Sequence, residues 1–238
     1  MPEIYDEIII GAGAAGLFAG VFAAAKTLVL EKGRRGGTKL AISGGGRANF
    51  SNRKLSPRFY LSRPDGNFPE SVLRRFGFRK LTSLFSQWGL PWEERAEGKF
   101  FLKVPARSLV DVLLRKSRCE IIYERAVKNI IPGAPFVVVT NRGDFYGRKI
   151  LIASGSPAAP QLGGDGRLWE ILKRLGHTVR PPEPALVPLL WQDETRFAAL
   201  AGISARAKVS WRHSLGILKE SEGDILFTHK GLSGPAIL

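Results

Sequence analysis

Small and apolar residues dominate positions 4 to 31, and their order predicts a strand, a helix and a second strand. Ile4–Ile10 is a short apolar run of the kind found in a buried strand. Residues 14–25 are mostly small and apolar, which favours a helix that packs close to a sheet. Residues 27–31 form a second apolar run that ends in Glu31. This order predicts parallel strands joined by a right-handed crossover.

The pattern is lost from residue 32 to about residue 69, where Gly, Arg, Ser and Asn are abundant. We expect a long loop there, and loops of such length are usually functional. Beyond it, helical spacing and runs of β-branched and aromatic residues return. They predict helices over 69–88 with a break near Gly77, 105–116 and 166–175, and strands over 99–103, 119–124, 127–131, 136–140 and 149–153.

The composition changes at a group of four prolines, Pro181, Pro182, Pro184 and Pro188. Short alternating segments follow, such as 205–211 and 224–228, and they predict strands. We therefore expect a domain boundary near residue 185. The predicted fold class is α/β, with a Rossmann-type domain and a parallel sheet over 1–185. Residues 186–238 are expected to start a smaller, mostly β second domain.

A glycine-rich turn joins the first strand to the first helix with the spacing GxGxxG, at Gly11, Gly13 and Gly16. The motif is informative because of this strand–turn–helix context. Gly11 permits the tight turn, Gly13 lets the backbone approach a pyrophosphate, and Gly16 lets the helix pack on the strand. The helix N-terminus then offers free N–H groups to phosphates.

Glu31 ends the second strand about twenty residues after Gly11, where an acidic side chain accepts hydrogen bonds from a ribose. A carboxylate there also disfavours a 2′-phosphate, so we do not expect NADP at this site. The alternative is a glycine-rich turn with an incidental glutamate.

Residues 39–52, KLAISGGGRANFSN, are the most unusual segment. Three consecutive glycines from Gly44 to Gly46 expose backbone N–H groups that can form an anion-binding nest. Arg47 adds donors suited to a phosphate or a carbonyl, and Asn49 can both donate and accept. The alternative is a flexible surface loop.

In these motifs the sequence resembles the BaiN-type flavoproteins, a family of NAD(P)/FAD-dependent oxidoreductases. The resemblance is carried in order by GAGAAG, VLEK, KLAISGGGRANFSN and KILIASG, and continues with GGDGRLWEILKRLGH, PALVPL and GDILFTHKGLSGPAIL. It implies a non-covalently bound FAD. The implied cofactor-binding residues are Gly11, Gly13, Ala14, Ala15, Gly16, Glu31, Lys32, Lys39, Ser43, Gly44, Gly45, Gly46, Arg47, Asn49, Val127, Ala153, Ser154 and Gly155.

Within that set, the resemblance implies that the three glycines of the turn contact the pyrophosphate and Glu31 the adenosine ribose. Val127 would touch the adenine through its backbone. Lys39, Ser43 to Arg47 and Asn49 would lie along the cofactor towards the flavin. Several features depart from the family. Ala48 stands where members commonly have Cys, and the chain ends at Leu238, within the second domain. We therefore expect an N-terminal portion that holds the ADP half of FAD better than the isoalloxazine.

The formal net charge is +15, from 36 Lys and Arg against 21 Asp and Glu. We interpret it as a solvated basic surface, with nucleic-acid binding as the alternative. The single cysteine, Cys119, excludes an internal disulfide and suggests a reducing cytoplasm. Acidic residues precede the first apolar run and glycines interrupt it, so we expect no membrane span or signal. The three histidines are dispersed, and we predict no metal site.

The leading hypothesis is an FAD-dependent oxidoreductase that transfers hydride through flavin N5 to or from an unidentified small molecule, with NAD(P)H as a candidate electron donor. No residue can be named as the catalytic acid or base. Two alternatives stay open. One is an FAD- or ADP-binding module without its own catalysis, completed by a partner segment. The other is a basic flavoprotein that binds nucleic acid.

Overall fold

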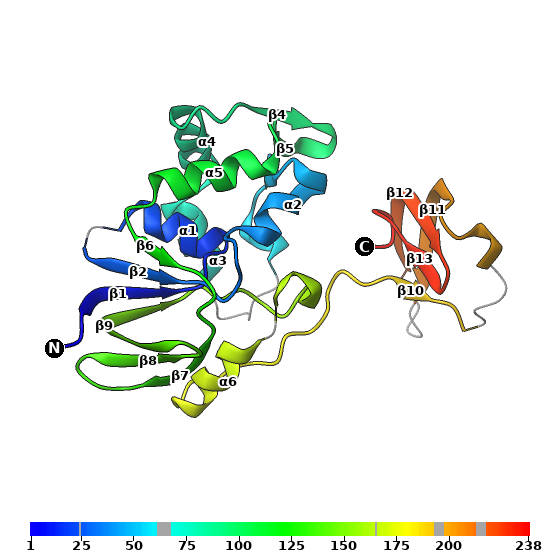
Figure 1. Cartoon of the computed structure of the whole chain (residues 1–238). Helices are drawn as coiled ribbons and strands as arrows, with labels where there is room; N and C mark the ends of the chain where they lie inside the picture. Colours follow the sequence, from blue (N-terminus) through cyan, green and yellow to red (C-terminus); the bar gives the residue numbers. More distant parts are fainter. Residues whose placement is uncertain (24, 61–67, 165, 193–197, 213–217) are drawn as a thin grey trace. The chain divides into compact units, whose positions relative to one another are not determined.

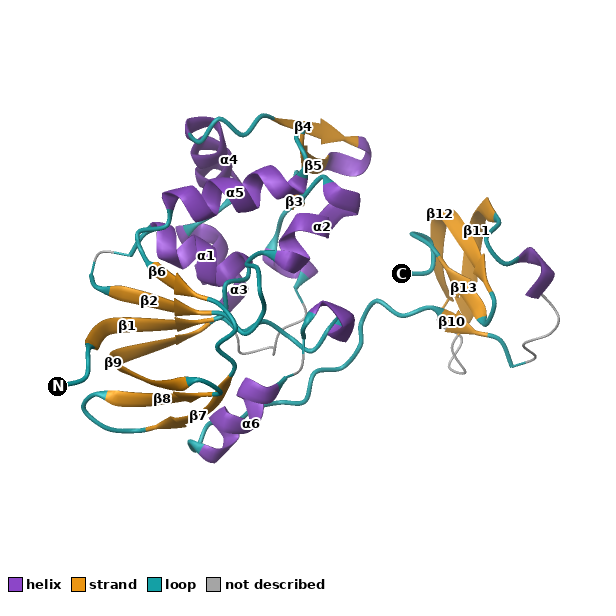
Figure 2. Cartoon of the chain, in the orientation of Figure 1, coloured by secondary structure: helices purple, strands orange, loops and turns teal. Residues whose placement is uncertain are grey.

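The computed structural model describes residues 1–23, 25–60, 68–164, 166–192, 198–212 and 218–238. The chain divides into two compact units, Met1–Val179 and Arg180–Leu238. The predicted functional domains 1–185 and 186–238 stay a prediction. The strands form three separate sheets, of six, four and three strands (Figure 2).

The largest sheet belongs to the first unit and has the strand order β6-β2-β1-β9-β8-β7. The first four strands in that order pair in parallel, and β8 pairs antiparallel with both β9 and β7. This arrangement confirms the predicted α/β class with a Rossmann-type parallel sheet. The strand bounds are β1 (Ile4–Ile10), β2 (Thr27–Leu30), β6 (Glu120–Ile122), β7 (Val127–Ile131), β8 (Phe136–Thr140) and β9 (Gly143–Ile152).

Helices cover both faces of this sheet, which explains why β1 is apolar at successive positions. Helices α1 (Ala14–Val21) and α5 (Ala106–Lys116) lie over one face and α6 (Arg167–Arg174) over the other (Figure 1). Successive side chains of a strand point to opposite faces. Accordingly, Ile9 packs in a core cluster with residues of α1 and α5, whereas Ile8 and Ile10 pack in a second cluster with residues of α6.

The segment expected to be a long loop contains regular structure, so that prediction is wrong for much of its length. It holds α2 (Thr38–Gly46), β3 (Asn49–Asn52) and a 3-10 turn (Pro57–Phe59). The strand β3 joins β4 (Trp92–Arg95) and β5 (Lys99–Leu102) in an antiparallel sheet of order β3-β5-β4. These strands are held by packing of aromatic side chains, among them Phe50 against Phe85 at 4.9 Å between ring centroids.

Several predicted bounds change. The first helix ends at Val21 rather than residue 25, and the strand expected over 149–153 begins at Gly143. The predicted break near Gly77 is confirmed, since it separates α3 (Phe68–Arg75) from α4 (Phe78–Gln87). Further 3-10 turns span Ala96–Gly98, Pro160–Leu162 and Ala198–Leu200.

The second unit contains an antiparallel sheet of order β10-β13-β12-β11. Its strands are β10 (Leu189–Leu190), β11 (Ser204–Arg212), β12 (Leu218–Thr228) and β13 (Gly231–Ser233). This agrees with the predicted mostly β character. Across the described part of the chain, no helix combines the length and the apolar character needed to cross a membrane.

Candidate functional site

A cavity of about 700 Å³ opens in the first unit at the carboxyl ends of β1, β2 and β9. This edge is where open α/β sheets bind their ligands, and the volume lies within the range of about 300–1,000 Å³ for small-molecule sites. The predicted residues that line it are Gly11, Gly13, Ala14, Ala15, Glu31, Lys32, Lys39, Val127, Ala153, Ser154 and Gly155.

The space available to a side chain differs among the three glycines of the glycine-rich turn. Gly11 has a φ of +107°, and a Cβ there would lie 2.6 Å from the carbonyl oxygen of Ala153. A Cβ on Gly16 would lie 1.8 Å from the carbonyl oxygen of Gly11, so helix and strand meet in direct backbone contact. A Cβ on Gly13 would meet no atom within 4 Å among the described residues, although Gly13 lines the cavity. Only Gly13 therefore leaves space that a ligand can use.

Glu31 is held by two backbone donors. Its Oε2 accepts from the N–H of Ala12 at 2.8 Å, and its Oε1 accepts from the N–H of Gly33 at 2.7 Å. A carboxylate offers about four acceptor positions, so hydroxyl donors from a ligand can still bind. The carboxylate thus links the glycine-rich turn to the loop that follows β2, and it faces the cavity with a fixed orientation.

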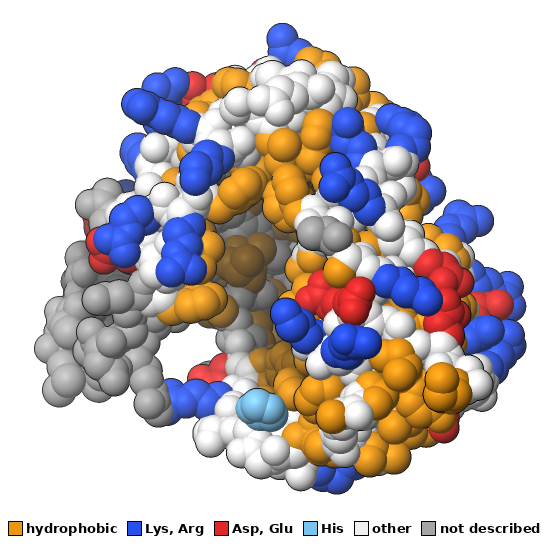
Figure 3. Space-filling view, turned by 90° about the vertical axis from the view of Figure 1, so that its left-hand side faces the viewer, with side chains coloured by type: hydrophobic (Ala, Val, Ile, Leu, Met, Phe, Trp, Pro, Cys, Tyr) orange, Lys and Arg blue, Asp and Glu red, His pale blue; other side chains and the backbone are white. Residues whose placement is uncertain are grey.

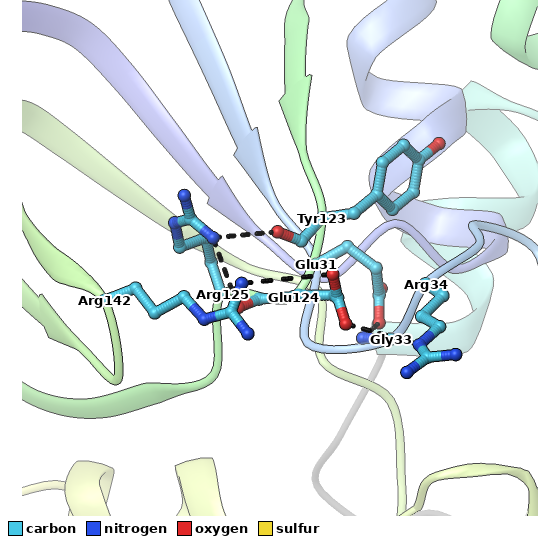
Figure 4. Close-up of polar contacts among 7 residues, drawn as sticks. All are labelled: Glu31, Gly33, Arg34, Tyr123, Glu124, Arg125 and Arg142. Carbon is cyan, nitrogen blue, oxygen red and sulfur yellow. Dashed lines mark hydrogen bonds and ion pairs between the residues drawn. The ribbon is translucent and has the colours of Figure 1, made fainter.

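Tyr123, Glu124 and Arg125 form a corner beside Glu31 (Figure 4), and Arg125, Ala126 and Val127 line the cavity. Glu31 donates its N–H to Ile122 and accepts from the N–H of Arg125 through its carbonyl, each at 2.9 Å. The guanidinium of Arg125 donates through Nη1 to the carbonyl oxygens of Tyr123 and Glu124, at 3.3 and 3.4 Å. These bonds position Val127, which is 4% exposed and lines the cavity.

Sequence reasoning missed this corner. Glu124 adopts a φ of +55°, which is unusual for a residue with a side chain, and no motif marked it. Its carboxylate lies 3.3 Å from Nε of Arg34 and 4.0 Å from Nη1 of Arg142. The three side chains are labelled in Figure 4. The Nε of Arg125 is buried and has no acceptor among the described residues. Arg34, Arg125 and Arg142 meet at this corner only in the folded chain, so their sequence positions do not indicate it.

Lys39 connects two segments of the cavity wall. Its ammonium donates to the carbonyl oxygens of Ser156, at 3.0 Å, and Ala158. It thereby ties the start of α2 to the loop that follows β9. A Cβ on Gly164 would lie 2.8 Å from the ammonium, so the lysine fits closely against this loop.

The three glycines that end α2 lie outside the lining of the cavity. Gly44, Gly45 and Gly46 have φ values of +57°, +65° and +81°, all in the left-handed region that favours glycine. Arg47 and Asn49 are exposed. The structure therefore does not bring Ser43, Gly44, Gly45, Gly46, Arg47 or Asn49 together with the turn, and Gly16 is buried beneath it. Their predicted contacts with a cofactor stay predictions.

Ala48, the position where BaiN-type proteins commonly have Cys, is 2% exposed and belongs to the core cluster around α1 and α5. Burial raises the pKa of the Cys119 thiol, whose Sγ lies 3.6 Å from the carbonyl oxygen of Gly20. Ala48 carries no thiol, and the raised pKa disfavours the thiolate form of the half-buried Cys119. Within the described residues, no group of three His, Cys, Asp or Glu side chains could hold a metal ion. His213 lies outside the described residues.

The charge of the cavity favours an anion. Its described lining contains five basic side chains, namely Lys32, Arg35, Lys39, Arg125 and Arg167, and one carboxylate, that of Glu31. The first turn of α1 adds N–H groups that have no partner within the helix. A pyrophosphate next to Gly13, with a ribose next to Glu31, fits these donors and acceptors. The residues present therefore fit the ADP half of a dinucleotide.

Comparison with known proteins identifies one family and several relatives. The family described as "HI0933-like protein Rossmann domain" matches residues 5–232. The chain is 31% identical over 252 residues to "Ribosomal RNA dihydrouridine synthase" of Haemophilus influenzae, covering 100% of this chain and 61% of that protein. It is 31% identical over 245 residues to the protein of the same name from Escherichia coli, covering 99% and 60%.

The chain is also 30% identical over 235 residues to "3-dehydro-bile acid delta(4,6)-reductase" of Clostridium scindens, covering 95% of this chain and 57% of that protein. This match confirms the resemblance to the BaiN-type proteins. The chain spans about three fifths of the length of the curated relatives it matches.

Proposed function

Because the chain belongs to the HI0933-like Rossmann domain family, we propose that its first 185 residues bind FAD as part of a flavin-dependent reductase. The observation that carries the proposal is the cavity beside the glycine-rich turn. Its walls offer an open approach at Gly13, a fixed carboxylate at Glu31 and an excess of basic side chains.

Each wall of the cavity has a distinct task in this proposal. The N–H groups at the start of α1 bind the pyrophosphate, and Glu31 accepts the ribose hydroxyls. The backbone of Val127 contacts the adenine, and the corner around Arg125 keeps that strand start in place. Ala153, Ser154 and Gly155 line the wall next to the turn. The segment from Ser43 to Asn49 lies beyond the cavity and extends the site towards the flavin.

The reaction class comes from the names of the relatives. A dihydrouridine synthase and a delta(4,6)-reductase both add hydrogen across a carbon–carbon double bond. Bound FAD supplies hydride transfer through its N5 atom. We propose the same reaction class for this protein, on a small-molecule substrate and with NAD(P)H as electron donor. The chain's own contribution is to bind the cofactor and to exclude water from the adenosine end.

RNA is the second candidate substrate, and one specific observation favours it. The net charge of +15 attracts a polyanion, and two of the relatives are named for ribosomal RNA. The two candidates share the cofactor and differ in what approaches it. Binding of RNA that weakens steeply with salt and prefers single strands supports the second candidate.

The test is a titration of purified protein with FAD, followed by removal of unbound cofactor and anaerobic addition of NADH or NADPH. Retained flavin absorbance that bleaches with the nicotinamide supports a reductase. Retained flavin that neither donor bleaches supports an FAD-binding module without its own catalysis. Protein that retains no flavin after supplementation contradicts the proposal.

A further inference from the structure

An uncompensated basic surface lies at the ends of four helices of the first unit. Exposed cations gather at the end of α3, the start of α4 and the end of α5, where α5 leads towards β6 (Figure 1). They are Arg74, Arg75, Arg79, Lys80, Arg115, Lys116 and Arg118. Among the described residues, none of the seven has a carboxylate within 4.0 Å. By contrast, Arg95, Lys99 and Arg107 of the same stretch each pair with an acidic side chain.

Direct contacts show that these helix ends form one surface. The ammonium of Lys80 donates to the carbonyl oxygen of Arg75 at 2.7 Å, which joins α4 to α3. The ammonium of Lys116 lies 5.9 Å from the ring centroid of Trp88, which joins α5 to the end of α4. Arg118 donates its N–H to Gly20 at 3.1 Å, which adds the end of α1.

Two exposed phenylalanines lie among these cations. Phe22 is 55% exposed and Phe76 is 38% exposed. Both contact the half-buried ring of Phe18, at centroid distances of 5.1 and 5.4 Å, and Trp88 lies 6.2 Å from the same ring. Phe18 therefore holds two aromatic rings at the surface between arginine and lysine side chains.

We propose that this surface, which we call the basic aromatic surface, docks single-stranded RNA. It consists of Phe22, Phe76 and the seven cations named above. Proteins that bind single strands combine cations that follow the phosphates with aromatic rings on which bases stack. A single strand supplies both complementary features, whereas a duplex hides the faces of its bases. Figure 3, viewed from the left-hand side of Figure 1, shows blue basic side chains on both sides of a hollow lined by orange hydrophobic ones.

The surface is separate from the proposed cofactor site. Helix α1 begins at the cavity with Ala14 and ends next to Phe22, so its eight residues place the two about 12 Å apart along the helix. RNA on the basic aromatic surface is thus an anchored substrate or partner and does not occupy the adenosine end. The inference rests on the second candidate of the proposed function, and FAD binding can be measured independently of it.

The charge test uses fluorescence anisotropy with a labelled oligouridine of about 16 nucleotides, the upper end of common single-strand site sizes. The double variant Arg75→Glu/Lys116→Glu reverses two cations of the surface. The matched control, Lys128→Glu/Lys149→Glu, makes the same charge change at two exposed lysines of β7 and β9.

We expect the surface variant to weaken RNA binding about tenfold or more, and the control about twofold. The slope of log affinity against log salt should fall in magnitude by about 1.4 in the surface variant, because each phosphate contact contributes about 0.7. Equal weakening by the two variants overturns the proposal and reduces RNA binding to nonspecific attraction. No detectable binding of the oligouridine by the unaltered protein also overturns it.

Stacking is tested with Phe22→Ala. We expect binding of the oligouridine to weaken about fivefold, the lower end of the range for one stacked base, with binding of heparin unchanged. An unchanged RNA affinity overturns the stacking role. Vesicles rich in anionic phospholipid that bind more tightly than the oligouridine, through the same cations, overturn RNA as the occupant. FAD titrations of every variant separate the outcomes, since a chain that binds RNA and no FAD contradicts the reductase proposal alone.

Discussion

The glycines of the turn predict opposite effects for two substitutions that add the same single methyl group. Gly13→Ala should leave the fold intact and weaken cofactor binding, whereas Gly16→Ala should weaken the fold. The distinction follows from their surroundings, because the space at Gly13 is open to the cavity and that at Gly16 is filled by the backbone of Gly11 and the side chain of Ile9.

The size of each effect can be worked from the structure. At Gly16 the new Cβ must retreat by about 1.2 Å before its contact with the Gly11 carbonyl reaches 3.0 Å. Overpacking of this kind costs about 1–3 kcal/mol, and the higher helix propensity of alanine returns about 1 kcal/mol. Because the obstructing atom is backbone, we take the upper end, a net loss of about 2 kcal/mol. That loss lowers Tm by about 4–8 °C.

At Gly13 the backbone angles, φ −79° and ψ −168°, suit alanine without strain. The methyl group instead holds a pyrophosphate away from the start of α1. Losing one hydrogen bond to a charged group costs about 1.5–3 kcal/mol, which is a loss of about tenfold to a hundredfold in FAD affinity. Stability should change by no more than about 0.5 kcal/mol, since the small N-cap preference for glycine opposes its greater chain entropy.

The assay combines thermal unfolding of the apoprotein with FAD titration by quenching of flavin fluorescence. Gly16→Ala should lower the Tm, whereas Gly13→Ala should lower the affinity for FAD and leave the Tm nearly unchanged. A Gly13→Ala protein that binds FAD like the unaltered chain would refute a phosphate site at this turn. A Gly16→Ala protein with unchanged Tm would refute the close backbone contact between α1 and β1.

Three further predictions concern single side chains. Glu31→Gln should weaken FAD binding about tenfold or more in the same titration, because an amide oxygen cannot accept from two backbone N–H groups and a ribose as a carboxylate does; unchanged affinity would contradict this. Lys39→Met removes the hydrogen bonds to the loop after β9, so limited proteolysis should cut residues 156–164 faster. An unaltered rate of cleavage would show that these hydrogen bonds do not hold the loop in place. Cys119, whose pKa burial raises, should react slowly with a thiol reagent until urea unfolds the protein, and fast reaction in the folded state would disprove its burial.

The parts of the fold set by local chemistry were predictable from the sequence. The apolar run at Ile4–Ile10, the glycines of the turn and Glu31 just after β2 were sufficient to predict the βαβ unit and the part of the cavity lining that the turn and Glu31 form. Each of these residues has a requirement that few other residue types meet, such as the φ of +107° at Gly11. Local sequence is informative when the backbone itself restricts the choice.

The parts set by distant partners were not predictable. The strand β3 was missed because its pairing partner, β5, lies about fifty residues away, and Asn49–Asn52 has little apolar character of its own. The short helix at the start of α2 was also missed, because the glycines that end it made the whole segment resemble a loop. The corner at Glu124 depends on bonds to the loop after Glu31, and nothing near Glu124 in the sequence indicates them.

The most direct test of the central claim, that the cavity beside the glycine-rich turn holds the ADP half of FAD, is a competition titration. Protein loaded with FAD is titrated separately with ADP and with FMN, and the FAD released from the protein is separated from FMN by chromatography and measured. The account predicts that ADP displaces FAD and that FMN, which lacks the adenosine diphosphate, does not. Displacement by FMN with no effect of ADP would contradict it.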